Sequence, residues 1–427
     1  MTIFWFRRDL RLHDNTALFE AFENENNVQP IFIFDDKILS ELPENDPRVN
    51  FIYDELEKIH QVLIKNGGGL EIYKGNPIDI WKDIIAKKSI NSVYFNHDYE
   101  PYARERDKKV YELLKEKGIK IVHKKDQVIF EKSEVTKDDG KPYTVYTPFK
   151  NKWLKKYKNN PIKLHGLPNF NNLKQEKNKF PSKSDINIKT SDIKVKPFSL
   201  NEIGTYDELR NYPAKDAGSY LGPHLRFGTV SPRELVLEAE KSNATFLSEL
   251  IWREFFMQIL WHFPDSAHQN FKPQYNGIEW RNNKDEFEKW CKGKTGYPIV
   301  DAGMRELNKT GYMHNRVRMI TASFLVKHLL IDWRWGEAYF AKKLLDFELA
   351  SNVGNWQWAA GTGCDAAPYF RVFNPYEQVK KFDKDLNYIR KWVPEFEDFS
   401  YPQPMVEHKF ARERAIATYK EGLNKTA

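Results

Sequence analysis

The chain has 427 residues, of which 41% are hydrophobic and 30% are charged, so a packed core is available and wholesale disorder is excluded. No apolar run approaches the ~18 residues of a membrane span, and the first basic residues follow the apolar run, the reverse of a secretory signal. The net charge is +7, but residues 150–196 alone hold 13 lysines against three acidic residues, as a solvated linker often does, so bulk charge is weak evidence for a nucleic-acid partner.

Cysteine usage narrows the class of protein further. Two cysteines, Cys291 and Cys364, cannot build a disulfide framework or a four-ligand zinc site. We therefore expect a soluble, cytosolic protein without a metal.

Short β-rich runs alternate with amphipathic segments over the first 130 residues. The runs predict strands at Thr2–Phe6, Pro30–Asp35, Leu70–Tyr73, Ser92–Asn96 and Lys120–His123. Between them, Val49–Lys65 predicts a helix that stops at Gly67–Gly69. This alternation is typical of a mostly parallel sheet with helices on both faces, so the predicted fold is α/β and Rossmann-like, with ligands beyond the carboxyl ends of the strands. No G-x-G-x-x-G sequence follows the first strand, which argues against a nucleotide-binding dehydrogenase.

The pattern changes twice along the rest of the chain. Residues 131–199 are rich in Lys, Asn and Pro with little periodicity, which indicates a connector between domains. From 200 onward the apolar spacing is helical, most clearly over Thr245–Phe263 and His314–Leu330. We therefore expect an α/β domain at 1–130, a connector at 131–199 and an all-α domain at 200–427.

A segment of small residues at 218–222 enters one of these helical stretches. Backbone N–H groups and the Ser219 hydroxyl could bind a pyrophosphate at a helix N-terminus, and an ordinary helix cap is the alternative.

The next dense motif, ELIWREFF at 249–256, places Glu249 and Arg253 one helical turn apart with Trp252 beside them. A surface ion pair worth roughly 0.3 kcal/mol is one interpretation. The other is that Glu249 hydrogen-bonds the edge of a flipped base while Trp252 stacks on it, since a flipped base is recognised in this way. In the motif at 313–319, Asn315 could make paired contacts to the polar edge of a flat ring, and Arg316 could hold a flanking phosphate.

Five motifs occur in order, at 218–234, 249–256, 313–319, 329–352 and 353–375. With the opening residues FWFRRDLRLHDNTAL, they resemble the DNA photolyase/cryptochrome flavoprotein family over essentially the whole chain, closest to the microbial, class I type cyclobutane pyrimidine dimer photolyases. The resemblance implies an α/β antenna domain and an all-α domain that holds FAD. It also implies light-driven repair of cyclobutane pyrimidine dimers in DNA, by electron transfer from the excited reduced flavin.

The resemblance further implies which residues do the work. The expected FAD contacts are Tyr206, Gly218, Ser219, Tyr220, Leu221, Gly222, Arg253, Asn315, Arg318, Asp346, Phe347, Glu348 and Asn352. The expected lesion contacts are Glu249, Trp252, Asn315, Arg316, Met319, Trp358 and Gln378. Catalytic roles are expected of Glu249, Asn352, Trp280, Trp333 and Trp356. The last three match an electron-transfer chain, although each could be a core tryptophan. Arg318 and Asp346 are expected to form a charge pair that fixes two helices.

A second, antenna chromophore is less well defined. Folate-using relatives carry an Asn-Glu pair shortly after a Tyr-Glu dipeptide, whereas Tyr99-Glu100 is followed here by Pro101, Tyr102 and Ala103. A deazaflavin or another flavin is therefore favoured over folate, with no antenna as the remaining option.

The main alternative function is a cryptochrome-type blue-light photoreceptor. Asn352, where plant cryptochromes carry Asp, and the 52 residues after Pro375 argue against it. Repair of (6-4) photoproducts is disfavoured because those enzymes show a His-His pair where this chain has His314-Asn315. We expect UV-damaged DNA as the partner, no membrane association and a monomer.

Overall fold

The computed structural model describes residues 1–425, and the chain forms two compact units that are each built from several segments. The first unit comprises Met1–Val135, Trp153–Phe198 and Tyr220–Lys241. The second comprises Thr136–Lys152, Ser199–Ser219 and the chain from Ser242 onward. The units interleave along the sequence, and the functional domain boundaries at 130/131 and 199/200 stay a proposal.

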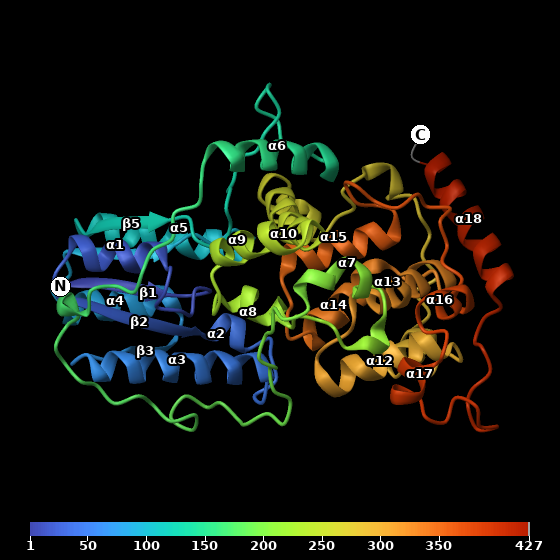
Figure 1. Ribbon diagram of the computed structural model, residues 1–427, viewed down its shortest axis with the longest axis horizontal. Coiled ribbons are helices and arrows are strands. Elements are labelled where there is room, and N and C mark those ends of the chain that lie inside the picture. The colour runs from blue at the N-terminus through green and yellow to red at the C-terminus, as the bar shows by residue number, and fades with distance from the viewer. Residues whose placement is uncertain (426–427) are drawn as a thin grey trace. The chain divides into compact units, whose positions relative to one another are not determined.

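A five-stranded parallel sheet is the centre of the first unit (Figure 1). Its strands are β1 (Thr2–Phe6), β2 (Val28–Asp35), β3 (Glu71–Gly75), β4 (Ser92–Asn96) and β5 (Lys120–Lys124). Their order is β3-β2-β1-β4-β5, so the direction of winding reverses between β1 and β4. The predicted α/β fold is confirmed, and each predicted strand end lies within two residues of the observed one.

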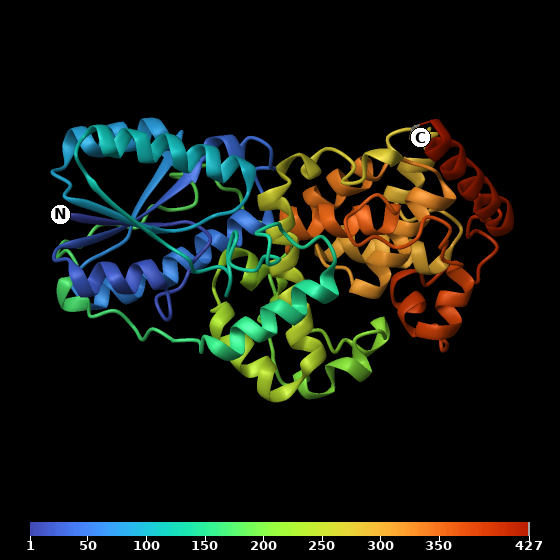
Figure 2. The same cartoon turned by 90° about the horizontal axis from the view of Figure 1, so that it is seen from above.

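Alternating side chains of the sheet contact helices on opposite faces. Phe4 and Phe6 pack with α1 (Thr16–Asn24) and α3 (Pro47–Lys65), whereas Ile3 and Trp5 pack with α4 (Pro77–Lys87) and α5 (Pro101–Glu116). Figure 2 shows these two pairs of helices on either side of the sheet. Because both faces are covered, β1 is buried along its whole length, as a central parallel strand requires. The other helices that begin in this unit are α2 (Asp36–Leu39), α8 (Leu221–Phe227) and α9 (Pro232–Ser242).

One carboxylate links three segments of the first unit. Asp126 is buried and accepts hydrogen bonds from Arg11 (2.7 Å) and Arg233 (2.8 Å), and also from the backbone N–H of Thr16 (3.0 Å). Burial alone would raise the pKa of Asp126, but the two guanidinium charges outweigh it and lower the pKa to about 2. The carboxylate is therefore charged at neutral pH.

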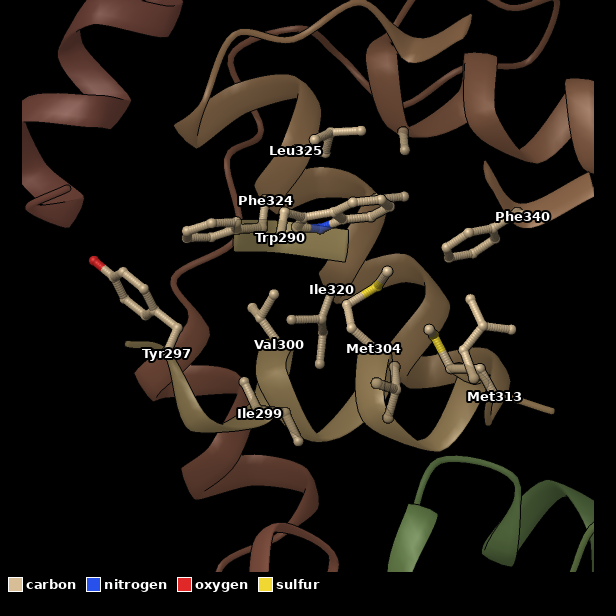
Figure 3. Packing of buried hydrophobic residues seen from close by; sticks show 14 of the residues in the cluster. Trp290, Tyr297, Ile299, Val300, Met304, Met313, Ile320, Phe324, Leu325 and Phe340 are labelled. Atoms are coloured by element: carbon tan, nitrogen blue, oxygen red, sulfur yellow. The ribbon is translucent and has the colours of Figure 1, made fainter. Parts of the chain in front are cut away.

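The described part of the second unit is helical. Its helices are α7 (Tyr206–Leu209), α10 (Ala244–His262), α11 (Lys284–Cys291), α12 (Pro298–Thr310), α13 (Asn315–Ser323), α14 (Trp333–Lys343), α15 (Leu349–Ala360), α16 (Pro375–Phe382), α17 (Asn387–Trp392) and α18 (His408–Lys425), while α6 (Tyr146–Asn159) begins in this unit. Figure 3 shows part of their shared core, in which Trp290 lies above Val300, Met304 and Ile320 with Phe340 nearby.

The two strongest helix predictions have different outcomes at their ends. Thr245–Phe263 corresponds to α10 almost residue for residue. In contrast, the stretch predicted at His314–Leu330 is the α-helix α13 followed by a π-helical turn at Phe324–His328. The wide turn contains the buried Lys327, whose Nζ donates to the carbonyl oxygen of Ala360 at 2.8 Å. The apolar spacing therefore predicted a helix correctly but could not distinguish its type.

We predict that Asp126→Asn lowers the free energy of unfolding at pH 7 by roughly 3–5 kcal/mol, because it leaves Arg11 and Arg233 buried with less compensating charge. The folded-state pKa of Asp126 lies below that of an unfolded Asp, so its contribution is present above about pH 4 and is lost as pH falls toward 2. Urea unfolding between pH 7 and pH 3 measures this. A difference in unfolding free energy between wild type and Asp126→Asn that does not shrink below pH 4 would show that the charge of Asp126 is not the source of the stability.

Candidate active site

A cavity that is partly open to solvent lies among α13, α14 and α15 of the second unit. Nine of the residues predicted as site residues line it: Asn315, Arg318, Met319, Asp346, Phe347, Glu348, Asn352, Trp356 and Trp358. Six further side chains complete the wall: Ala322, Phe340, Leu344, Ser351, Asn355 and Ala359. The cavity therefore combines an aromatic and aliphatic wall with a polar edge of amides and charged groups.

Helix α15 supplies one side of this cavity through its spacing. It begins where the Glu348 side chain accepts a hydrogen bond from the backbone N–H of Ser351 (2.9 Å), an N-cap contact. Asn352, Asn355, Trp356 and Ala359 follow at positions i, i+3, i+4 and i+7, so they share one face of the helix.

The charge pair predicted between Arg318 and Asp346 is present. Two parallel hydrogen bonds of 2.8 and 3.2 Å join the guanidinium to the carboxylate, and Arg318 Nε also donates to the Met313 carbonyl oxygen (2.8 Å). The paired side chains are 27% and 19% exposed, so water screens them only in part. The pair therefore joins α13 to the turn that precedes α15 and sets one corner of the cavity.

Asn352 is oriented by a residue that we did not predict. Its amide nitrogen donates to Glu337 Oε1 on α14 at 2.8 Å and to the Glu337 carbonyl oxygen at 3.2 Å. Burial raises the pKa of Glu337, and the hydrogen bond from Asn352 lowers it by less. Because the amide nitrogen is engaged with Glu337, the amide oxygen of Asn352 is the atom left to accept a hydrogen bond from a ligand.

Close packing fixes the relative position of α14 and α15. A Cβ atom at Gly336 would lie 2.1 Å from Trp356 Cη2, a distance that no real pair of atoms adopts. The Trp356 ring is buried and also lies 5.0 Å from Phe340 in an edge-on arrangement. Glycine at position 336 therefore lets Trp356 sit directly against α14.

The predicted lesion residues of α10 lie outside the lining of this cavity. Glu249 accepts a hydrogen bond from Arg210 at 2.6 Å. The Trp252 ring is stacked by Tyr146, with ring centres 3.6 Å apart and planes 9° apart. Tyr146 is held in turn by its hydroxyl, 2.7 Å from the Ser248 carbonyl oxygen. One face of Trp252 is therefore covered, and a base could stack only on the rest of the ring.

Arg316 lies in a cluster of positive charges. It donates to Asn211 Oδ1 (2.7 Å) and lies 4.4 Å above the Phe382 ring, while its Nε is buried without a hydrogen-bond partner. Burial lowers the pKa of Arg316, and the charges of Arg210 and Arg371 lower it further. An anion would therefore be stabilised beside these three guanidinium groups.

Four further predicted residues lie in the second unit but outside the lining of the cavity. Trp333 is buried and donates from Nε1 to Asn270 Oδ1 (2.8 Å), and the partly buried Trp280 packs edge-on against Tyr419 (5.9 Å between ring centres). Arg253 and Gln378 are half-buried on α10 and α16.

The predicted phosphate-binding segment at 218–222 is divided between the two compact units. Gly218 and Ser219 belong to the second unit, and Tyr220, Leu221 and Gly222 belong to the first. Helix α8 begins at Leu221, after Tyr220 in the left-handed conformation (φ 53°). In the second unit, burial raises the pKa of Tyr206 to about 12. The ligand contacts of residues 218–222 and of Tyr206 remain predictions.

Three further observations bear on cofactors and location. Among residues 1–425, no group of three or more His, Cys, Asp or Glu side chains could hold a metal ion. Over the same residues, no helix has the length and hydropathy of a membrane span. In the first unit, Glu100 pairs with Arg8 (3.0 Å) and with Arg226, while Tyr102 donates to Asp35 (2.6 Å). Glu100 of the Tyr-Glu dipeptide and Tyr102 after it are thus engaged within the unit.

We predict that Glu337→Leu weakens FAD binding at least about fivefold, because the Asn352 amide loses its acceptor and its orientation. Glu337→Gln should stay near wild type, since a glutamine carbonyl still accepts from Asn352. Titration of the apoprotein with FAD, followed by flavin fluorescence, measures both variants. Equal affinities for all three proteins would show that Glu337 does not orient the amide.

Comparison with known proteins supplies the family. Residues 2–169 match the family model described as DNA photolyase, and residues 246–400 match the FAD binding domain of DNA photolyase. The chain is 37% identical to the deoxyribodipyrimidine photo-lyase of Agrobacterium fabrum, over 98% of this chain and 97% of the relative.

Solved structures agree over nearly the whole chain. A class III photolyase from Agrobacterium tumefaciens matches with a TM-score of 0.85 and 34% identity, covering 99% of this chain and 98% of that one. An archaeal photolyase from Sulfolobus tokodaii, solved with two FAD molecules, matches with a TM-score of 0.84 and 35% identity, covering 98% of this chain and 99% of that one. A Synechocystis cryptochrome matches with a TM-score of 0.85 and 25% identity, covering 98% of this chain and 99% of that one. Together with the cavity in its FAD-binding domain, these matches show that the chain belongs to the deoxyribodipyrimidine photo-lyase family of DNA photolyases.

Proposed function

We propose that this FAD-dependent DNA photolyase uses light to split cyclobutane pyrimidine dimers in DNA. The observation that carries the proposal is the cavity lined at once by the predicted flavin contacts Arg318, Asp346 and Asn352 and by the predicted lesion contacts Met319 and Trp358. A single cavity that holds both sets would bring a cofactor and a damaged base together without an intervening protein layer.

The residues of the cavity fit a flavin. A flat tricyclic ring suits a wall of Phe340, Leu344 and Trp356, and the polar edge of such a ring suits Arg318 and Asn352. When bound, reduced FAD supplies the electron that splits the dimer after it absorbs light. The residues of the chain position the two partners and exclude water, and Asn352, as a neutral amide, accepts a hydrogen bond without donating a proton.

The proposed substrate follows from the chemistry at position 315. Splitting a cyclobutane dimer breaks two C–C bonds and moves no group, so an electron and hydrogen bonds to the carbonyl groups suffice. Repair of a (6-4) product also needs a proton donor, a task for histidine near neutral pH. Asn315 lines the cavity and cannot transfer a proton in this way.

We propose that Glu249 hydrogen-bonds the dimer while Trp252 and Trp358 contact its faces. A dimer is already poorly stacked, so flipping it out of DNA costs less than flipping normal bases, and this difference favours damage. Because Tyr146 covers one face of Trp252, the contact with the lesion would use the remaining face or edge of the indole.

The proposed electron supply to oxidised flavin runs through Trp356, Trp333 and Trp280. Trp356 lines the cavity, Trp333 is fully buried, and Trp280 is partly exposed, an order that suits transfer from the surface inward. This chain would recharge the cofactor and would take no part in repair itself.

Further parts of the proposal rest on sequence alone. We propose a class I type subgroup, a deazaflavin or second flavin as antenna in preference to folate, a cytoplasmic location and a monomer. A cryptochrome-type photoreceptor is the rival function, and since a solved cryptochrome has the same fold, only an assay of repair separates the two.

We predict that purified protein with a reductant restores thymine from cyclobutane dimers under blue light and leaves (6-4) products untouched. Glu249→Ala should keep its flavin but lose roughly tenfold in repair yield, since a charged hydrogen bond to the lesion disappears. Chromatography of irradiated oligonucleotides measures both. Repair of (6-4) lesions would overturn the substrate, and no repair of either lesion by fully reduced protein would favour the photoreceptor.

We predict that Trp356→Phe slows photoreduction of oxidised flavin at least about tenfold yet leaves repair unchanged when the flavin is reduced chemically beforehand. Absorbance of the flavin during illumination and repair by the prereduced variant are the two measurements. If the prereduced variant were inactive, Trp356 would instead be required for repair itself, either in the lesion pocket or by shaping the cavity through its packing against Gly336.

We predict that Arg316→Ala weakens binding of damaged DNA about tenfold at fixed salt and lowers the salt slope by about one, because one phosphate contact is lost. Changing five exposed linker lysines to glutamine should have little effect: Lys155, Lys158, Lys163, Lys177 and Lys179. Fluorescence anisotropy at several salt concentrations measures both variants. A larger loss of affinity in the lysine variant than in Arg316→Ala would place the DNA-binding surface on the linker.

A further inference from the structure

The carboxylate proposed to contact the lesion is paired with an arginine. Glu249 Oε1 accepts from Arg210 Nη1 at 2.6 Å, and the two side chains are 34% and 26% exposed. A pair that is this accessible to water is held weakly enough for either partner to be exchanged. In this arrangement, Arg210 offsets part of the charge of Glu249, so the carboxylate is a weaker acceptor for an N–H group of a base.

Arg210 also has more positive charge around it than Glu249 balances. It follows α7 directly, and the next residue, Asn211, accepts a hydrogen bond from Arg316 (2.7 Å). Arg210 and Arg371 both repel the charge on Arg316, whose Nε is buried without a partner. Three guanidinium groups thus lie close enough to repel one another, and a second anion beside them would reduce that repulsion.

We propose that Arg210 couples recognition of the DNA backbone to the release of Glu249. A phosphodiester that enters the cluster of Arg210, Arg316 and Arg371 replaces Glu249 as the partner of Arg210, and the freed carboxylate accepts a hydrogen bond from the dimer. This inference rests on the proposed function, because it assigns Glu249 to the lesion.

Each charged group keeps a hydrogen-bonding partner throughout this exchange. Before it, Glu249 pairs with Arg210; after it, a phosphate pairs with Arg210, and the carboxylate of Glu249 accepts a hydrogen bond from an N–H donor of the damaged base. Neither anion is left buried without a partner. The exchange is therefore favourable only when a phosphate and a hydrogen-bonding base arrive together.

The consequence is a specificity that base contacts alone would not give. A dimer that lacks flanking phosphates leaves Arg210 on Glu249 and must compete with the ion pair for the carboxylate. A dimer within a DNA strand brings the phosphate that removes this competition. Arg210 is thus a specificity-determining residue that discriminates against phosphate-free dimers.

A matched ion pair elsewhere in the same unit provides the control. Arg305 and Glu395 are also 2.6 Å apart, with side chains 25% and 36% exposed, close to the values for Arg210 and Glu249. Neither residue lines the cavity or belongs to the arginine cluster. Arg305→Gln therefore measures the effect of losing a partly exposed ion pair that lies away from the site.

The test compares two substrates: a cyclobutane thymine dimer within an oligonucleotide, and the free thymine base dimer without sugar or phosphate. For Arg210→Gln, we expect kcat/KM to fall about tenfold on the oligonucleotide, with a salt slope lower by about one, and to rise severalfold on the free base dimer. Arg305→Gln should change neither. Arg210→Lys, which restores the charge, should recover part of the loss on the oligonucleotide.

An equal fall on both substrates, with flavin content unchanged, would overturn the coupling and leave Arg210 as an ordinary structural residue. If Arg210→Gln does not fold, wild-type protein tests the same idea with dinucleotide dimers that carry no, one or two flanking phosphates. Repair of bound substrate should rise with each phosphate, and a flat series would contradict the proposal. Failure of wild-type protein to repair the dimer in any DNA would instead overturn the proposed function, and the coupling with it.

Discussion

The contact between α14 and α15 is the constraint on which the rest of the site depends. Gly336 gives Trp356 room that no other residue would leave, and one residue further along α14, Glu337 receives the amide of Asn352. The first contact sets how closely the helices approach, and the second sets which atom of Asn352 is offered to a ligand. The geometry of the cavity therefore follows from one glycine and one hydrogen bond.

Two kinds of charge pair are found around this site, and their difference has a functional meaning. Arg318 and Asp346 share two hydrogen bonds and connect α13 to the turn before α15, so they are suited to hold the cavity in shape. Arg210 and Glu249 share one and lie beside two further arginines. The first pair is part of the scaffold, whereas the second is suited to exchange partners when DNA arrives.

The strands and the main helices could be predicted from the sequence, because they depend on local patterns of residues. Parallel strands in such a sheet are short apolar or β-branched runs, which located β1 to β5, and helical spacing located α10 and α13. Glu337, Tyr146 and Arg210 were not predicted, since their roles depend on contacts between distant segments: Tyr146 and Ser248 are 102 positions apart. Nothing in the local pattern around Tyr146 indicates that it covers Trp252, and a carboxylate on α14 resembles any surface residue of a helix.

A crystal structure of the protein with FAD and a duplex that contains a cyclobutane dimer would test the central claim most directly. The account predicts density for the flavin ring in the cavity among α13, α14 and α15, with the amide oxygen of Asn352 in contact with its polar edge. It also predicts the flipped dimer in the same cavity beside Met319 and Trp358. A flavin ring bound elsewhere, or a dimer separated from it by protein side chains, would contradict the account.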